Sequence, residues 1–465
     1  MVDTTGYVAA EDPSEGVTEP DSGRNTTLSG WGGWPRSAAR VVRPDDAGAL
    51  TGIDPTTRFI PRGLGRSYGD AAQLAGGVVM DMTGLTRIEL ERDSGRITAG
   101  GGASLGEVIS LALSHGWFLP VTPGTRHVTV GGAIAADVHG KNHHRDGSFG
   151  GYVERIRLLT VDARIRDVTP TDTAFSATVG GMGLTGIILE ATFRLRPVTT
   201  SWMKVDSARG ADLPAVMGML ASADRDRTYT VAWIDLTPAG RGRGIVLAGD
   251  HADVDDLSAR QRRHPLRRKT PHELGVPPLP GRGVVWPATV GVFNRLWFQR
   301  SPLREVDKLQ PLDPFFYPLD LLADWPRLYG ATGFLQYQFV VPDGAIDTLL
   351  AIAEVLTRIA TPVSLAVLKR MGRGAGGLLS FPMEGWTLSA DLPLGDPALG
   401  AELDGCDRLV AEVGGRVYLA KDSRTRPELI PVMYPDLAAW QEMKGRLDPG
   451  EQIASDLSVR LGITS

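Results

Sequence analysis

The chain contains very little cysteine. Among its 465 residues only Cys406 carries a thiol, which excludes an internal disulfide framework and any zinc site built from cysteines. Cys406 lies at helical spacing with Leu399, Leu403 and Val410, a pattern typical of the buried face of a helix. We therefore expect Cys406 to lie in the core, and we expect no metal site.

A long apolar run and an excess of charge are also missing. The longest stretches without Asp, Glu, Lys or Arg, residues 108–125 and 173–189, are interrupted by Gly, Pro or His and fall short of a membrane span. With 49 Lys and Arg against 54 Asp and Glu, the net charge is −5, which provides no basic field for nucleic acid. Any membrane contact is therefore expected to be peripheral, and nucleic acid is not expected as a partner.

The first thirty residues lack the basic and then apolar order of a signal peptide. They are polar, acidic and rich in turn-forming residues, so we expect residues 1–30 to be a disordered tail. With neither a signal peptide nor a membrane segment in the sequence, we expect the protein in the cytoplasm or peripherally at the cell envelope.

Glycine, by contrast, is abundant, with 57 residues. The segment from Pro61 to Asp70 reads PRGLGRSYGD and places three glycines around Arg62 and Arg66. This composition predicts a basic loop with an exposed backbone, which is able to wrap a pyrophosphate.

A second glycine-rich segment, from His127 to His144, reads HVTVGGAIAADVHGKNHH. Gly131 and Gly132 begin a short apolar helical turn, whose start is expected to offer unpaired N–H groups and the positive end of a dipole to a phosphate. His139 and Lys141 follow closely. The alternative is a glycine-rich turn followed by a solvated polar loop.

A third segment contains the spacing G-x-G-x-x-G at Gly181, Gly183 and Gly186. A Rossmann nucleotide site needs a strand before this motif and a helix after it. Here polar residues precede the motif, and residues 187–197 alternate as a strand does. We therefore predict a turn close to a ligand and reject a Rossmann site.

The first part of the chain alternates strands, helices and glycine loops. Residues 78–82 and 156–161 read as strands, and Ser104 with Glu107 forms a capping box before a helix that ends near Gly116. This alternation is typical of a mixed α+β domain.

The pattern changes at Thr199. Period-two runs predict strands at 229–236, 334–341, 363–369 and 386–392, and apolar stripes predict helices at 346–359 and 398–413. We expect an antiparallel sheet backed by helices, in a domain that carries substrate specificity. The basic run RQRRHPLRRK at 260–269 fits a solvated loop better than a patch for anionic lipid.

The last part of the chain begins with an alternating strand at 416–420, followed directly by Lys421 and Asp422. An amphipathic helix is predicted near Leu437 and a short one near Ala454. The polar cluster after the strand makes a site at Lys421 plausible.

Five segments together resemble a known family: PRGLGRSYGD, PGTRHVTVGGAIAADVHGKNHH, ATVGGMGLTGII, FLQYQFVVP and VYLAKDSR. In this order they are similar to the vanillyl-alcohol-oxidase-type flavoproteins, and within them to the decaprenylphosphoryl-β-D-ribose 2'-oxidases. The resemblance implies an α+β fold with a two-part FAD-binding domain, residues 31–198 and 416–465, and an inserted antiparallel-sheet substrate domain, residues 199–415.

The resemblance also implies the residues of the site. Those expected to line FAD are Arg62, Gly63, Leu64, Gly65, Arg66, Ser67, Tyr68, Gly69, Asp70, Gly124, Thr129, Val130, Gly131, Gly132, His139, Gly140, Lys141, Asn142, Ile188 and Tyr418. Those expected to contact substrate are Lys141, Trp233, Gln336, Gln338, Lys369, Ser389 and Lys421. Lys421 would be the main catalytic residue, with His139 and Tyr68 handling protons or orienting the substrate, and Lys369 would pair with a phosphate.

The activity implied is FAD-dependent oxidation of the 2'-hydroxyl of a polyprenylphosphoryl-β-D-ribose to a 2'-keto sugar. This is the first half of an epimerisation that provides the arabinose donor for cell-wall arabinan. An NADH-dependent short-chain reductase would complete the epimerisation, and a quinone or another acceptor would reoxidise the flavin. The alternatives are an aldonolactone or alditol oxidase acting on a soluble sugar, and a flavoprotein that has lost catalysis and serves as a scaffold.

The chain departs from the family pattern at several positions. The loop from Pro61 to Asp70 contains no histidine for a covalent flavin bond, so FAD is expected to bind non-covalently. Ser389 stands where relatives carry a cysteine, and Met371 and Thr387 differ from the aromatic and amide residues expected there. These substitutions bear on the substrate pocket and leave the flavin loops intact.

Overall fold

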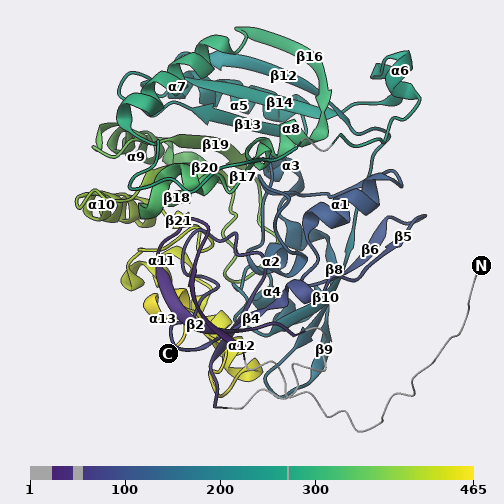
Figure 1. The fold of residues 1–465 in the computed structure, drawn as a ribbon, viewed down its shortest axis with the longest axis vertical. Coiled ribbons are helices and arrows are strands. Elements are labelled where there is room, and N and C mark those ends of the chain that lie inside the picture. Colours follow the sequence, from purple (N-terminus) through teal and green to yellow (C-terminus); the bar gives the residue numbers. More distant parts are fainter. Residues whose placement is uncertain (1–22, 45–55, 270–271) are drawn as a thin grey trace, which may run out of the picture.

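The computed structural model describes residues 23–44, 56–269 and 272–465, and Figure 1 shows their arrangement. Two small sheets come from the N-terminal part of the chain. The first has the order β1-β2-β4-β3 and the second the order β5-β6-β10-β8-β9. Their strands are β1 (Arg24–Ser29), β2 (Arg36–Val42), β3 (Phe59–Arg62), β4 (Val78–Asp81), β5 (Ile88–Glu91), β6 (Arg96–Gly100), β8 (Val153–Leu159), β9 (Ile165–Val168) and β10 (Ile187–Arg194).

Strand β1 corrects part of the expectation of a disordered tail. Residues 24–29 pair with β2 in antiparallel register, from Arg24 opposite Val41 to Ser29 opposite Arg36. The β-branched Thr26 and Thr27 favour a strand. The strand lies at the exposed edge of its sheet, so its residues are polar, and this polar composition suggested a tail. The rest of the predicted tail, residues 1–22, lies outside the described residues.

The helices of this part are short. They are α1 (Leu105–Leu113), α2 (Val130–Ala135), α3 (His143–Asp146) and α4 (Thr173–Thr178). The predicted capping box begins α1, since Ser104 Oγ accepts from Glu107 N at 3.1 Å and Ser104 N donates to the Glu107 carboxylate at 2.8 Å. Strand β10 directly follows Gly186, which confirms that the G-x-G-x-x-G spacing is a turn before a strand.

The middle of the chain forms an eight-stranded antiparallel sheet in the order β16-β12-β14-β13-β19-β20-β18-β21. The four strands predicted from alternation are all in it, as β13 (Tyr229–Ile234), β18 (Phe334–Val341), β19 (Leu365–Met371) and β20 (Gly385–Pro393). Strands β12 (Trp202–Gly210), β14 (Gly244–His251) and β16 (Arg304–Pro311) were not predicted. Their glycines, and the mostly exposed residues of the edge strand β16, hide the alternation.

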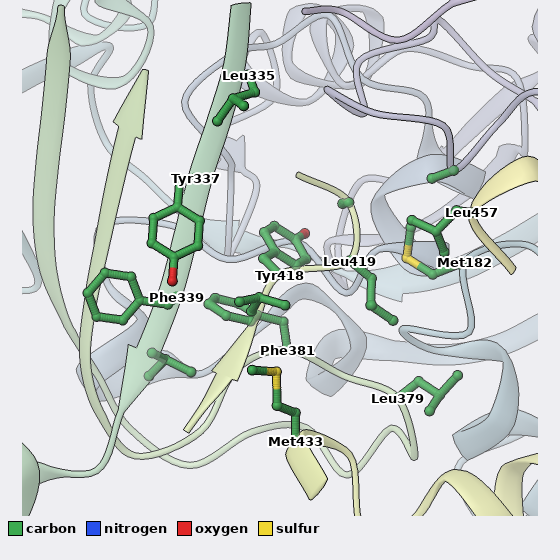
Figure 2. Packing of buried hydrophobic residues seen from close by; sticks show 14 of the residues in the cluster. Met182, Leu335, Tyr337, Phe339, Leu379, Phe381, Tyr418, Leu419, Met433 and Leu457 are labelled. Carbon is green, nitrogen blue, oxygen red and sulfur yellow. The ribbon is translucent and has the colours of Figure 1, made fainter. Parts of the chain in front are cut away.

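Helices cover one face of this sheet. They are α5 (Leu213–Asp226), α9 (Ile346–Arg358) and α10 (Leu399–Glu412), and the last two match the predicted helices within about one residue. Cys406 is buried on α10, as expected. Leu335, Tyr337 and Phe339 alternate along β18 and belong to the apolar core, in which the ring centroids of Tyr337 and Phe339 lie 5.5 Å apart (Figure 2). The intervening Gln336 and Gln338 must therefore lie on the opposite face of the strand.

The end of the chain returns to the N-terminal sheets. The predicted strand at 416–420 is shorter in the structure, because β21 (Arg416–Val417) ends in a turn in which Lys421 N donates to Tyr418 O at 2.8 Å. Helices α11 (Ile430–Met433), α12 (Leu437–Leu447) and α13 (Asp456–Arg460) follow. In Figure 1 this yellow segment lies beside the purple N-terminal strands, and Phe59 N donates to Gln452 O at 2.8 Å.

The remaining elements connect these parts: β7 (Trp117–Phe118), β11 (Arg196–Pro197), β15 (Leu274–Gly275), β17 (Leu322–Ala323), α6 (Ala259–Arg262), α7 (Pro287–Arg300) and α8 (Leu312–Phe316). Within the described ranges, no helix is both long and apolar enough to cross a bilayer.

Candidate active site

One cavity of about 400 Å³ lies where the glycine loops, the eight-stranded sheet and the C-terminal turn meet. The residues predicted to line FAD that do line this cavity are Arg62, Gly63, Leu64, Gly65, Arg66, Ser67, Tyr68, Gly124, Thr129, Gly131, Gly132, His139, Ile188 and Tyr418. The substrate residues that line it are Gln336, Gln338, Lys369, Ser389 and Lys421. Three stretches far apart in sequence thus converge on one space.

The loop after β3 offers its backbone to this cavity. Among the described residues, no acceptor pairs with the N–H groups of the four consecutive residues 64–67. The loop is tight: Gly65 has a φ of +63°, and a Cβ on Gly63 would lie 2.2 Å from Thr129 Oγ1. Successive free amides in a turn bind anions, so this loop fits the pyrophosphate of a dinucleotide.

The two arginines of the loop line the cavity, but both also have partners within the protein, which the prediction of a basic pyrophosphate loop did not include. Arg62 donates to the carbonyl oxygens of Ala72 at 2.8 Å and Ser29 at 2.7 Å, and its guanidinium lies under Gly65. Arg66 stacks over the Trp31 ring at 3.9 Å from the centroid. The guanidinium of Arg62 therefore stabilises the conformation of the loop through these two hydrogen bonds.

The helix start at Gly131 also differs from the prediction of unpaired N–H groups. Val130 N donates to Ala103 O, Gly131 N to Gly101 O and Gly132 N to the Thr129 hydroxyl. A Cβ on Gly131 would lie 3.0 Å from Gly101 O. Glycine is needed here for close approach of two backbone segments, and no amide of this turn is left for a phosphate.

The wall of the cavity opposite the loop comes from three adjacent strands. Gln336 faces Asp391 across β18 and β20, Gln338 faces Ser389, and Ser389 faces Val367 on β19. Since alternate residues share a face, this register puts the polar side chains of β18, β19 and β20 on one surface. Leu365 and Val367 complete the wall and were missed from the sequence.

His139 is held at both ring nitrogens. Its Nδ1 lies 3.1 Å from Lys369 Nζ and its Nε2 lies 3.1 Å from the Gln338 amide. Burial, together with the charge of Lys369, lowers the pKa of His139 well below its ordinary value. The imidazole is therefore neutral at pH 7, with one nitrogen donating and the other accepting.

Lys421 reaches into the cavity from the turn after β21. Its Nζ donates to Gln336 Oε1 and lies 3.8 Å from the centroid of the Tyr68 ring, while the amide nitrogen of Gln336 donates to Asp391. Burial lowers the pKa of Lys421 and raises the pKa of Asp391, so desolvation favours the neutral form of both groups. Burial also keeps Tyr68 a neutral phenol by raising its pKa.

Asp391 is a site residue that sequence analysis did not single out. It is buried, and its Oδ2 has no hydrogen-bond partner within the described part of the chain. A carboxyl in the same period-two register as Thr387 and Ser389 was the available signal. Only the pairing of β18 with β20 reveals that Gln336 links it to Lys421.

Lys369 is the second half-buried lysine of the wall. Burial, with smaller contributions from the charges of Lys141 and Lys421, lowers its pKa to about 7. Thr387, the neighbour behind it, accepts from Gln338 at 3.2 Å and donates to Phe339 O at 2.8 Å, so threonine holds Gln338 in place. Met371 is buried in the core and does not line the cavity.

Two predicted substrate residues lie elsewhere. Lys141 turns toward α8, where its Nζ donates to Phe316 O at 3.1 Å, and burial lowers its pKa to about 8. Trp233 lies on β13 and does not line the cavity. Five predicted FAD residues support the cavity from behind instead of lining it: Gly69, Asp70, Val130, Gly140 and Asn142.

These supporting residues have clear structural partners. Asp70 receives two hydrogen bonds from Arg460, at 2.9 and 2.8 Å, and a Cβ on Gly69 would lie 1.9 Å from Asp422 O. Asn142 donates to Pro120 O at 2.8 Å. They fix the loops that shape the cavity.

Comparison with known proteins bears on the cofactor and the family. Residues 54–169 match the FAD binding domain family. The chain is 39% identical over 450 residues to the decaprenylphosphoryl-β-D-ribose oxidase of Mycolicibacterium smegmatis. The aligned residues cover 93% of this chain and 97% of that protein. It is 40% identical over 371 residues to an uncharacterized protein of Streptomyces coelicolor, covering 77% and 100% of the two chains.

A more distant likeness reaches only part of the chain. The alditol oxidase of a Streptomyces species is 24% identical over 178 residues, 37% of this chain and 43% of that protein. The match along nearly the full length of the mycobacterial protein and the free amides of the first glycine loop agree on the cofactor. The chain belongs to the decaprenylphosphoryl-β-D-ribose oxidase family of FAD-dependent oxidoreductases.

Proposed function

We propose that this protein oxidises the 2'-hydroxyl of a polyprenylphosphoryl-β-D-ribose to the 2'-keto sugar. The observation that carries the proposal is the polar wall of the cavity, on which two half-buried lysines, Lys369 and Lys421, accompany His139. One lysine is available for the reacting hydroxyl and the other for a phosphate. A neutral soluble sugar would need only the first.

FAD, when bound, supplies the acceptor for the hydride that leaves the carbinol carbon. The amides of residues 64–67 would hold its pyrophosphate, and Tyr418, stacked on Phe381 at 4.5 Å between centroids, would form part of the wall beside it. We propose that FAD is bound non-covalently, because the loop from Pro61 to Asp70 offers no histidine.

Lys421 is proposed to take the proton of the substrate hydroxyl. Burial favours its neutral amine, which is the form that accepts a proton, and the ammonium that results is stabilised by the Asp391 carboxyl through Gln336 and by the face of the Tyr68 ring. A lysine with a lowered pKa is thus matched to proton transfer near neutral pH.

His139 and Gln338 are proposed to orient the sugar. Their mutual contact at 3.1 Å fixes the imidazole, and Lys369 on its other nitrogen lies within reach of an anionic group that enters the cavity. An ammonium binds phosphate oxygens as a point charge, so Lys369 is assigned to the lipid-linked phosphate. Ser389, on the same face, would offer its hydroxyl to the substrate.

Residues 31–198 and 416–465 are proposed to form the FAD-binding domain and residues 199–415 the substrate domain. The keto product requires reduction with inverted stereochemistry to give an arabinose donor for cell-wall arabinan, which we assign to an NADH-dependent short-chain reductase. A quinone or another acceptor would reoxidise the flavin.

The test is an anaerobic titration of the purified protein with a polyprenylphosphoryl ribose, followed by flavin absorbance. Acid precipitation beforehand should release the flavin into the supernatant. Bleaching by the lipid-linked ribose and not by alditols or aldonolactones is the expected result. Bleaching by soluble sugars alone would contradict the proposal in favour of an alditol or lactone oxidase, and bleaching by neither would favour a non-catalytic role.

A further inference from the structure

Helix α7 differs from an ordinary surface helix because it exposes large apolar side chains and buries the polar Asn294 beside Val290. The face of α7 that packs on the protein is partly polar: buried Asn294 donates to Asp235 at 2.9 Å, and Phe298 O accepts from Arg209 at 3.3 Å. The outward face carries large apolar side chains. Val292 and Phe293 are 61% and 60% exposed, whereas a surface helix normally turns such residues inward.

The exposed apolar residues cluster along this one segment. Among the described residues, eight of the fifteen exposed large apolar side chains lie between positions 284 and 306: Val284, Trp286, Val292, Phe293, Leu296, Trp297, Leu303 and Val306. The rings of Phe293 and Trp297 stack in parallel with centroids 6.2 Å apart. Scattered exposed apolar residues need no explanation, but a contiguous patch of this kind marks an interaction surface.

The charges of α7 and its flanks are mostly positive, and the one carboxylate of the segment, Glu305, pairs with Lys308 at 3.0 Å. Residues 282–304 contain four arginines, at 282, 295, 300 and 304, and no Asp or Glu. A two-fold contact with a second copy of this chain would place arginines against arginines. An apolar face rich in Trp and Phe with arginines beside it matches the interface of an anionic bilayer.

The segment is also continuous with the rim of the cavity. Val284 N donates to Leu328 O at 2.8 Å, and Val285 packs in a cluster with Tyr68, Trp325 and Leu322, all three of which line the cavity. A substrate with its sugar in the cavity and its chain in a bilayer would need a bilayer next to this rim.

We propose that the outward face of α7, with Trp286 before it and Leu303 after it, is the surface by which the protein binds the interface of an anionic lipid bilayer. The basic run at 260–269 is the weaker candidate for membrane contact. Arg268 donates two hydrogen bonds to the Asp313 carboxylate, at 2.7 and 2.9 Å, and Lys269 lies over the Trp202 ring. The proposal places membrane contact on one helix; its argument from the cavity rim rests on the proposed lipid-linked substrate, whereas its argument from the exposed apolar side chains and the arginines does not.

The test is co-sedimentation of the FAD-loaded protein, without substrate, with phosphatidylcholine vesicles with and without phosphatidylglycerol. We expect binding to the anionic vesicles to exceed binding to neutral ones, and to fall about tenfold or more in the double variant Phe293→Ser, Trp297→Ser. The matched control is Ile165→Ser, Val459→Ser, which removes apolar residues of comparable exposure, 47% and 45%, from other elements.

Several outcomes would overturn the proposal. They are absence of wild-type binding to anionic vesicles, equal binding by both double variants, and a concentration-dependent dimer that the α7 variant abolishes. Binding seen only with an added protein partner would also overturn it. If the α7 variant fails to retain FAD, quenching of wild-type tryptophan emission by brominated lipid decides instead, and its absence would overturn the proposal. Detergent-solubilised substrate should bleach the flavin of the α7 variant normally, which separates this proposal from the proposed function.

Discussion

Two adjacent ionisable residues, half-buried Lys421 and buried Asp422, have opposite kinds of surroundings. Asp422 is fully partnered: Arg460 donates to it at 2.9 Å, and the Thr425 hydroxyl and amide donate at 2.7 and 2.9 Å. Burial alone would raise the pKa of Asp422, but these contacts lower that pKa below its ordinary value. The carboxylate is locked in its charged form.

Lys421, on the other side of the same turn, meets its counter-charge only through an amide. Gln336 stands between it and Asp391, so neither group gains the direct ion pair that would fix its protonation. The comparison teaches that a buried charge with direct partners serves the fold, whereas one separated from its partner keeps the ability to exchange a proton.

The largest expected effect is on Lys421. The variant Lys421→Met should slow anaerobic flavin reduction by the lipid-linked ribose by about three orders of magnitude, because it removes the group assigned to take the hydroxyl proton. Its unfolding midpoint in urea should stay the same or rise, since a half-buried, partly desolvated amine is replaced by an apolar chain of similar length. Lys308→Met, an exposed lysine on β16, is the control. Unchanged reduction would remove Lys421 from the mechanism.

Asp422 should show the converse. The variant Asp422→Ala leaves Arg460 and Thr425 without their shared acceptor, and we expect a loss of about 3 kcal/mol in the free energy of unfolding. Denaturant unfolding followed by circular dichroism measures it. The FAD that remains bound should still be reduced by substrate at a rate close to wild type. A stable variant that has lost reduction would reverse the roles assigned to the two residues.

Lys369 should make phosphate binding depend on pH. Its pKa is lowered to about 7, so the ammonium is present below that pH and is lost above it. The dissociation constant for the phosphorylated lipid, measured by fluorescence titration, should therefore rise by about tenfold between pH 6 and pH 8. Lys369→Arg keeps its charge across this range and should flatten the dependence. An equally steep dependence in Lys369→Met would assign the titration to another group.

Asp391 should produce the smallest effect. Its charge raises the pKa of Lys421 against the effect of burial, so Asp391→Asn should lower that pKa. The acid limb of the pH profile for flavin reduction should then move to lower pH by about half a unit. Ser389→Ala, on the same strand face, should leave the limb in place. A shift in both variants would point to a general change of the cavity.

Local patterns predicted much of the fold. Period-two alternation located β13, β18, β19 and β20, and a four-residue capping box located α1. Strands β12, β14 and β16 escaped, and two of them lack that alternation: β14 has consecutive buried residues, and β16, at the edge of the sheet, has no buried residue. Alternation of apolar and polar residues predicts a strand only when one face of the strand is buried and the other is exposed.

The site was predicted less completely because contacts across the sheet are not local. The glycine loops were found from their own composition, whereas the residues of the polar wall were expected only from the resemblance to the family. The amides of residues 130–132 were expected to be free, yet Gly101 and Ala103, about thirty positions earlier, accept from two of them. Lys141 was expected at the substrate, but the carbonyl of Phe316 draws it toward α8. Neither partner is visible in the motif.

The close packing of the glycine loop on the C-terminal turn has a consequence for synthesis. Tyr68 N donates to Ala420 O at 3.0 Å, and Gly69 contacts Asp422 so closely that no side chain fits between them. The loop that offers its amides to the cofactor leaves the ribosome about 350 residues before the turn that braces it. A nascent chain therefore lacks a finished flavin cradle until residues 420–422 have emerged, and cofactor loading follows the folding of that turn.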